Sequence, residues 1–265
     1  MYSSSNDYVF KSKRLFVELN LFAYKQLISC VFPAFIFLML AISSVMDLQF
    51  ISRYDFLFVA CIVAQYILVK TGIESKREVL VIMGFHIIGF ILEVHKVNVG
   101  SWSYPEDAIT KIAGVPLYSG FMYSSVASYI CRAWENFDLR IKNWPRNLIT
   151  IPLGLAIYIN FFSNAFIADF RWYIAVALVI AFRKSFVEFN TNGYYRRMPI
   201  ILSFILIGFF IWIAENLATF LNAWKYTYQH SGWEMVDFGK WSSWSLLVIV
   251  SFIIVAQLKL LKRNE

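Results

Sequence analysis

Two glutamates stand at matching positions in two apolar regions of the sequence. The segments "EVHKVNVGSWSY" (93–104) and "ENLATFLNAWKY" (215–226) both read glutamate, eight residues, tryptophan, one residue, tyrosine, at a constant offset of 122. A carboxyl group held in apolar surroundings keeps its proton more readily and can donate it near neutral pH. Glu93 and Glu215 are therefore candidates for an acid and a base that act away from bulk water.

Other polar side chains recur at helical spacing near these glutamates. His86 precedes Glu93 by seven residues, which places both on one face of a helix, two turns apart. Tyr118, Tyr129 and Arg132 share a second helical face. We predict that these groups converge on one cavity, with Glu93, Glu215 and His86 as the catalytic residues. The predicted substrate-binding set consists of Trp102, Tyr104, Tyr118, Tyr129, Trp224, Tyr226 and Arg132.

Structural roles explain the same residues without any chemistry. A carboxylate near a membrane interface can reach water or pair with Lys96, Lys225 or Arg171, and tryptophan and tyrosine are enriched at both interfaces. The sequence has no nucleotide-binding, phosphate-loop or zinc-protease motif, so we expect no cofactor. We also expect no metal site, because no metal-ligand spacing joins His86, Glu93, His95 and His230.

The elements that must position these residues are membrane-spanning helices. Apolar residues make up 59% of the 265 residues, aromatic residues 19%, and the mean hydropathy is +0.60. Apolar stretches of roughly 17–21 residues, the length needed to cross a bilayer, recur along the chain. We predict an all-α, polytopic helix bundle with eight spans near 26–46, 54–70, 78–93, 114–131, 147–163, 165–182, 199–220 and 243–261.

Loop charges give the orientation of this bundle. With the N-terminus inside, 18 of the 24 Lys and Arg residues fall in cytoplasmic segments and 6 in outer segments. Asp169 and Arg171 interrupt the fifth and sixth spans, and the loss of one crossing would move the C-terminus to the other side. The asymmetry favours eight crossings with both termini cytoplasmic. The net charge of +7 then reflects orientation toward membrane lipids, not nucleic-acid binding.

The matching segments indicate an internal duplication within a single integral membrane domain, 1–265. Residues 1–134 would form the first four-helix half and residues 147–261 the second, in the same orientation. The first span shifted by 122 residues lies close to the fifth. Chance is the alternative, because the chain holds 9 Trp and 15 Tyr residues.

Three functions fit this pattern. An intramembrane enzyme would use the glutamates to protonate and deprotonate a lipid, an isoprenoid or another hydrophobic small molecule, with aromatic rings stabilising a cation. A transporter would use them to bind a proton or an ion. A scaffold without chemistry is the third possibility. No pattern in the sequence indicates an oligomeric state.

Four stretches together resemble the YoaT-like family of bacterial integral membrane proteins, a domain-of-unknown-function family: "ILEVHKVNVGSWSYPE", "GVPLYSGFMYSSVASYICRAW", "WIAENLATFLNAWKY" and "GKWSSWSLLVIVSFIIVAQLKLL". The resemblance covers most of the chain. It implies a multi-pass protein of the bacterial cell membrane and assigns no activity.

A second resemblance covers about a tenth of the chain. Glu93, the loop from Gly100 to Tyr104 and the segment from Gly114 to Leu117 are similar to a pattern in carotenoid-processing membrane proteins of the bisanhydrobacterioruberin hydratase and small lycopene cyclase type. That likeness implies a polyene substrate. The sequence departs from the pattern at His95 and Lys96, where glycine and small residues are expected.

Overall fold

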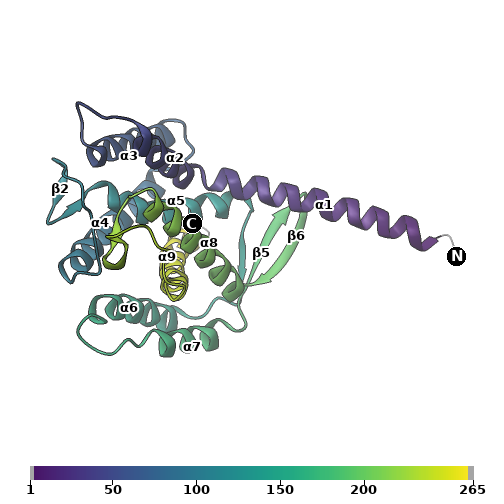
Figure 1. Cartoon of the computed structure of the whole chain (residues 1–265). Coiled ribbons are helices and arrows are strands. Elements are labelled where there is room, and N and C mark those ends of the chain that lie inside the picture. Colours follow the sequence, from purple (N-terminus) through teal and green to yellow (C-terminus); the bar gives the residue numbers. More distant parts are fainter. Residues whose placement is uncertain (1–2, 262–265) are drawn as a thin grey trace.

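The computed structural model describes residues 3–261, which are mostly helical. The described chain forms the helices α1 (Ser3–Ser29), α2 (Val31–Val45), α3 (Arg53–Lys70), α4 (Lys76–Asn98), α5 (Tyr118–Asn136), α6 (Asn147–Ser163), α7 (Arg171–Phe182), α8 (Ile200–Phe220) and α9 (Lys240–Leu261). Figure 1 shows α5, α8 and α9 in the middle of the bundle, with α2 and α3 on one side and α6 and α7 on the other. Each predicted span overlaps a helix, and the first span, 26–46, overlaps the end of α1 as well as α2.

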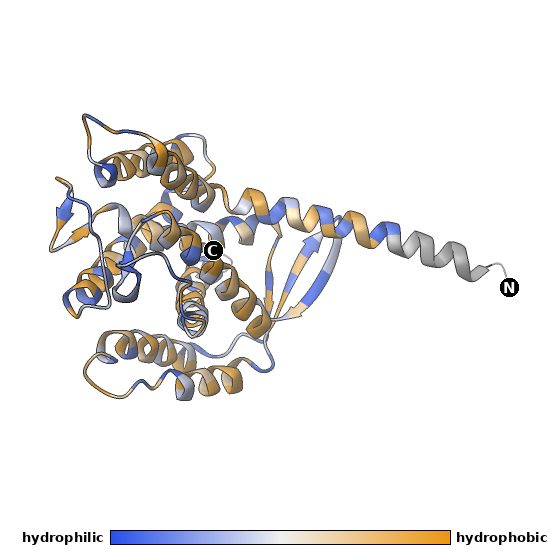
Figure 2. Cartoon of the chain, viewed as in Figure 1, coloured by the Kyte–Doolittle hydropathy of each residue, from blue (hydrophilic) through white to orange (hydrophobic). Residues whose placement is uncertain are grey.

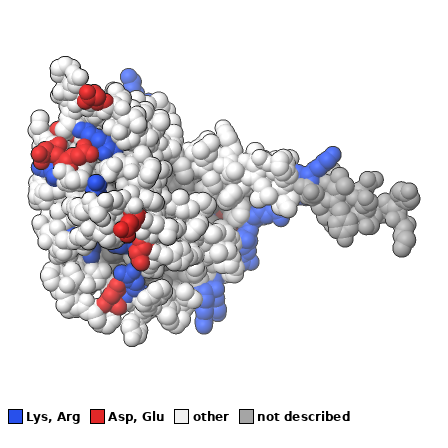
Figure 3. Space-filling view, viewed as in Figure 1, with Lys and Arg blue, Asp and Glu red and all other residues white. Residues whose placement is uncertain are grey.

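The surfaces of the helices are those of a membrane protein. Within the described residues, α4, α8 and α9 are long and apolar enough to cross a membrane, and a fourth span is added if α1 and α2, bent by 66°, count as one. Large apolar side chains point outward, with exposed fractions of 74% at Leu80, 85% at Leu148 and 66% at Phe210. Figure 2 shows the helices mostly in the hydrophobic colour, and in Figure 3 most of the drawn face carries no charged side chain. Lipid contact is the physical reason for such an exposed apolar surface.

The sixth predicted span is shorter than expected. α7 begins at Arg171 and not at residue 165, because the Asp169 side chain accepts hydrogen bonds from the Asn160 amide, at 2.9 Å, and from the Arg171 backbone N–H, at 2.9 Å. These bonds hold the connection between α6 and α7 in a turn. Figure 1 shows α6 and α7 running side by side on either side of this turn.

A three-stranded antiparallel sheet departs from the all-α expectation. Its order is β4 (Arg140–Lys142), β5 (Phe186–Thr191), β6 (Tyr194–Pro199). Asn192 and Gly193 join β5 to β6 with positive φ angles of 54° and 79°, the conformation of a tight hairpin turn. The sheet lies against α1, where the Lys25 ammonium donates to the Asn190 carbonyl at 2.9 Å. α1 itself was also not expected as a helix over its full length.

Two loops close one end of the bundle, and we call them the roof: residues 99–117 between α4 and α5, and residues 221–239 between α8 and α9. The first holds β1 (Trp102–Ser103), β2 (Lys111–Ile112) and β3 (Val115–Pro116), and the second holds β7 (Lys225–Tyr226) and a 3-10 turn (Thr227–Gln229). β1 and β7 pair antiparallel, with Trp102 opposite Tyr226 and Ser103 opposite Lys225. The roof is thus one connected structure.

The first turn of α3 anchors the roof. Arg53 donates to the Glu106 carboxylate at 2.9 Å and to the Leu221 carbonyl at 2.5 Å, which ties both loops to one side chain. The Asp55 carboxylate accepts from the backbone N–H groups of Ile109 and Thr110 at 2.9 and 2.8 Å. These bonds hold the loop that carries Trp102 and Tyr104 in a fixed position.

Close helix contact at Gly208 supports a first prediction, that Gly208→Ala destabilises the protein by about 1–3 kcal/mol. A Cβ at this position of α8 would lie 2.3 Å from the Ser245 hydroxyl and 2.7 Å from the Ser245 backbone nitrogen on α9, so the two helices would have to separate. Thermal unfolding in detergent measures the change.

The matched control for this prediction is Gly84→Ala in α4, where a Cβ would meet nothing within 4 Å. That variant is expected to be neutral, or stabilised by about 0.4–1 kcal/mol, because alanine has fewer unfolded conformations to lose. Equal unfolding temperatures for the two variants would show that the α8–α9 contact tolerates a wider separation.

Candidate active site

One cavity of about 1000 Å³ extends through the bundle, and α8 lines it along most of its length. The lining residues of α8 include Ile200, Phe204, Ile207, Ile211 and Glu215, which lie on one helical face. Ile200 and Glu215 are 15 residues apart, or about 22 Å along a helix. The cavity is apolar toward Ile200 and the sheet, and it is polar at the end beneath the roof.

Glu93 lies at the polar end and is held by three donors. Its Oε2 accepts from the Trp102 indole N–H and from the Tyr104 hydroxyl, both at 2.7 Å, and its Oε1 accepts from the Tyr123 hydroxyl at 2.7 Å. The residue is 4% exposed and lines the cavity. α4 supplies the carboxylate, the roof supplies two donors and α5 supplies the third.

Glu215 lies in the same cavity with a similar set of donors. Its Oε1 accepts from the Tyr226 hydroxyl at 2.5 Å and its Oε2 from the Trp244 indole N–H at 2.7 Å. The residue is also 4% exposed. In both halves of the chain a glutamate therefore accepts from the tyrosine eleven residues later in the sequence.

The tyrosines of the roof remain hydrogen-bond donors at physiological pH. Burial raises the pKa of Tyr104 well above its usual value, and the nearby Glu93 carboxylate raises it further. Burial likewise raises the pKa of Tyr226, together with the Glu215 carboxylate. Each phenol therefore keeps the proton that it donates to its glutamate.

Two lysines share the polar end. The Lys96 ammonium donates to the Asn164 side-chain oxygen at 2.7 Å, and Lys96 is 6% exposed. The Lys240 ammonium lies 5.4 Å from the ring centre of Trp102 and 4.8 Å from that of Tyr226. Asp169 and Arg171 also line this end and form an ion pair at 2.6 Å.

The structure brings together most, but not all, of the predicted site. Glu93 and Glu215 line the cavity, and so do Trp102, Tyr104, Tyr129, Trp224 and Tyr226. Tyr123, Trp244 and Lys240 belong to the same place and were missed. Tyr123 and Trp244 carry no sequence signal beyond being polar aromatic residues, whereas Lys240 is a charge at the start of an apolar stretch, which is a usable signal.

Three predicted site residues lie elsewhere. The His86 ring packs 4.4 Å from the Phe121 ring and against Gly120, where α4 and α5 are in close contact. Tyr118 is fully buried and donates to the Ala223 carbonyl at 2.7 Å, so it supports the roof. Arg132 forms ion pairs with Glu78 and Glu135 toward the other end of α5. None of the three lines the cavity.

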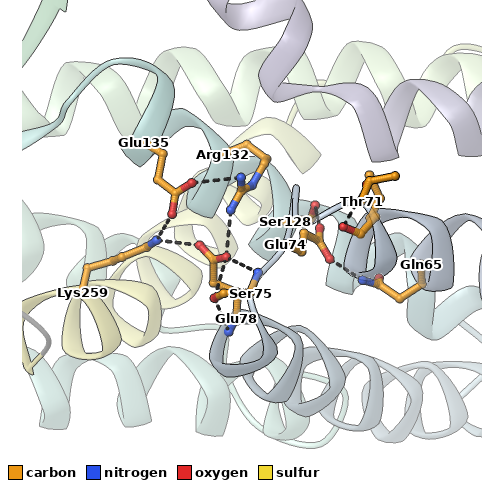
Figure 4. Close-up of polar contacts among 10 residues, drawn as sticks. Gln65, Thr71, Glu74, Ser75, Glu78, Ser128, Arg132, Glu135 and Lys259 are labelled. Carbon is orange, nitrogen blue, oxygen red and sulfur yellow. Dashed lines mark hydrogen bonds and ion pairs between the residues drawn. The ribbon is translucent and has the colours of Figure 1, made fainter.

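A second polar group lies apart from this site, and Figure 4 shows it. In what we call the Glu78 cluster (Glu78, Arg132, Glu135 and Lys259), the Glu78 carboxylate accepts from Arg132 at 2.8 Å and from Lys259 at 2.6 Å. Ser75 caps α4 and also donates to Glu78. The cluster joins α4, α5 and α9.

Glu74, beside the Glu78 cluster, is 1% exposed and accepts hydrogen bonds from Gln65 and Ser128. Burial raises the pKa of Glu74 against the effect of these hydrogen bonds. The side chain joins the connection between α3 and α4 to α5.

Comparison with known proteins gives a family without an assigned activity. The family model DUF817, described as a protein of unknown function, matches residues 18–252. The uncharacterised protein YoaT of Bacillus subtilis (strain 168) is 52% identical over 244 residues, which are 92% of each chain.

Two crystal structures are also similar in part. The Insig homolog MvINS from Mycobacterium vanbaalenii, at 12% identity, has a TM-score of 0.48, and a cross-linked MvINS trimer, also at 12% identity, has a TM-score of 0.49. Each comparison covers 68% of this chain and 93% of the other.

Proposed function

For this chain, which belongs to the DUF817 family of proteins of unknown function, we propose an intramembrane enzyme that acts on a lipid or isoprenoid. The observation that carries the proposal is the position of Glu93 and Glu215 at the polar end of one otherwise apolar cavity. An apolar substrate would fill the cavity along α8 and present its reactive carbon to both carboxyl groups.

The two carboxyl groups suit acid and base chemistry on an alkene. Two carboxylates in one poorly solvated cavity repel each other, so one of the pair keeps its proton while the other is ionised. The acid gives its proton to one alkene carbon, and the cation that forms on the neighbouring carbon is stabilised by the rings of Trp102, Trp224 and Tyr226. The carboxylate then takes a proton from an attacking water, which gives hydration, or from the adjacent carbon, which moves the double bond.

The proposed enzyme crosses the bacterial cell membrane eight times, with both termini in the cytoplasm. The bent pair α1 and α2 forms the first crossing, and α3 to α9 form the others. The distribution of Lys and Arg supports this orientation, and so do the exposed cations on the sheet, Arg140, Lys142, Arg196 and Arg197, which suit the cytoplasmic side. The roof and the polar end of the cavity then face outward.

An internal duplication of residues 1–134 and 147–261 accompanies this proposal. The offset of 122 makes Ser103 equivalent to Lys225, and Tyr104 equivalent to Tyr226. In the β1–β7 pair, Ser103 is opposite Lys225 and Trp102 is opposite Tyr226, which is the register that a local two-fold axis midway between Ser103 and Lys225 produces. The register therefore supports a two-fold relation between the halves, with the two glutamates as equivalent residues.

The proposed function is tested by comparing lipid extracts from cells with and without the gene by mass spectrometry. We expect one class of lipid or isoprenoid to lose a product and accumulate its precursor, with a mass difference of one water or of zero. An unchanged lipid profile together with altered uptake of an ion or solute would overturn the enzyme and favour a transporter.

A further inference from the structure

Three cations gather at the polar end of the cavity, and among the described residues only one of them forms an ion pair. Arg171 pairs with Asp169, whereas Lys96 is held by the neutral Asn164 amide and Lys240 lies over two aromatic rings. Neither lysine forms an ion pair with a carboxylate in the part of the chain that the structure describes. Lys240 and Arg171 repel Lys96, and Arg171 repels Lys240, while Asp169 attracts Lys96. The carboxylates that act on Lys240 are Glu215, Asp237 and Glu93, and none of them forms an ion pair with it.

Such an arrangement is costly without a further anion. Lys96 is almost fully buried, and a buried charge is stable only when it is paired and hydrogen-bonded. Glu93 and Glu215 already accept five hydrogen bonds from indole and phenol donors, and the acid and base chemistry requires one of the two to be neutral. The cations then exceed the anions at this end of the cavity.

We propose that the cavity binds an amphiphile with a phosphate-type headgroup, the headgroup among Lys96, Arg171 and Lys240 and the apolar chain along α8. This inference rests on the proposed function and names its substrate class. Phosphate oxygens accept hydrogen bonds from several cations at once, which suits two ammonium groups and a guanidinium. The cavity volume of about 1000 Å³ and its long apolar face suit a chain more than a free anion.

The inference is tested by the binding of three probes to the purified full chain in maltoside micelles, followed by tryptophan fluorescence, since Trp102, Trp224 and Trp244 line the cavity. We expect dodecyl phosphate to bind saturably, and 1-dodecanol and inorganic phosphate each to bind at least tenfold more weakly. Equal binding of dodecanol would overturn the anion site. Equal binding of inorganic phosphate would show a site for a free anion and overturn the amphiphile.

Charge variants locate the site. Lys240→Gln and Lys96→Gln are each expected to weaken dodecyl phosphate binding at least fivefold, while Lys225→Gln, in the same roof but outside the cavity lining, leaves it unchanged. Lys96 is buried, so the binding result of its variant counts only if the variant keeps the unfolding temperature of the natural chain. Lys240 is half-buried, so its replacement disturbs the packing less, and the Lys240→Gln variant decides the test. Unchanged binding by Lys240→Gln would contradict the inference.

The carboxylate variants separate this inference from the proposed function. The pair of glutamates carries one negative charge, and Glu93→Gln or Glu215→Gln each leaves one carboxylate to carry it, so each variant is expected to bind dodecyl phosphate about as tightly as the natural chain. If the natural chain does not bind the probe but both glutamates are still required for lipid conversion, the headgroup assignment is wrong and the proposed enzyme activity is kept. If the probe binds but neither glutamate affects any lipid, the chemistry fails and the binding site stands.

Discussion

Glu93→Gln and Glu215→Gln are each expected to lower the conversion of the lipid substrate by about 10²–10⁴-fold, the usual contribution of a general acid or base. Glutamine has the shape of glutamate but neither gives up nor takes a proton at neutral pH. The measurement is the ratio of product to precursor in extracts of cells that carry each variant. Loss of either residue alone should have nearly the full effect, because the two act in one reaction.

The folds of both variants are expected to survive, because the hydrogen bonds can be kept. An indole N–H only donates, so the glutamine oxygen must face Trp102 in one site and Trp244 in the other. The amide nitrogen then faces a tyrosine hydroxyl, Tyr123 or Tyr226, which can accept as well as donate. Expression and unfolding temperature should therefore remain close to those of the natural chain.

Glu234→Gln is the control for this prediction, because Glu234 is an exposed glutamate of the roof. It should convert the substrate at the natural rate. Conversion at the natural rate by Glu93→Gln or Glu215→Gln would contradict the acid and base roles and leave these residues as anchors of the roof.

Much of the fold follows from the apolar pattern. The predicted spans overlap helices because each long apolar run forms a helix, although only α4, α8, α9 and the bent pair α1 and α2 meet the length and composition of a membrane span within the described residues. The spacing from Glu93 to Tyr104 recurs from Glu215 to Tyr226, but the hydrogen bond from each tyrosine to its glutamate was not predicted. The β5–β6 hairpin was missed although Asn192 and Gly193 form one of the strongest short turn signals.

The composition of the site was harder to predict, because polarity does not identify the inner face of a membrane helix. Tyr129 of the expected polar face lines the cavity, but Tyr118 and Arg132 do not, and the lining residues of α5 extend to Ser119, Tyr123 and Val126. At 100° per residue, the lining face is therefore turned away from Tyr118 and Arg132 and toward Tyr123. The polar face instead binds partners that only the packing reveals, a roof carbonyl at one end and Glu78 at the other.

The Glu78 cluster gives the largest expected effect on stability. Glu78→Gln should destabilise the protein by up to about 3–5 kcal/mol, because it leaves the buried cations Arg132 and Lys259 with only the half-exposed carboxylate of Glu135. Their side chains are 10% and 8% exposed, so water cannot replace the carboxylate. Glutamine at position 78 can still accept from Ser75, so the change isolates the charge from the helix cap. Denaturant unfolding in mixed micelles measures it.

Glu135→Gln is the matched control, because Glu135 contacts the same two cations but its side chain is 44% exposed. An exposed ion pair contributes only about 0–1 kcal/mol, so this variant should unfold close to the natural chain. A triple variant, Glu78→Met with Arg132→Met and Lys259→Met, should recover most of the stability lost in Glu78→Gln, because removal of all the buried charges leaves none unpaired. If Glu78→Gln and Glu135→Gln unfolded alike, water would have to reach the cluster, and α4, α5 and α9 would be joined by apolar packing alone.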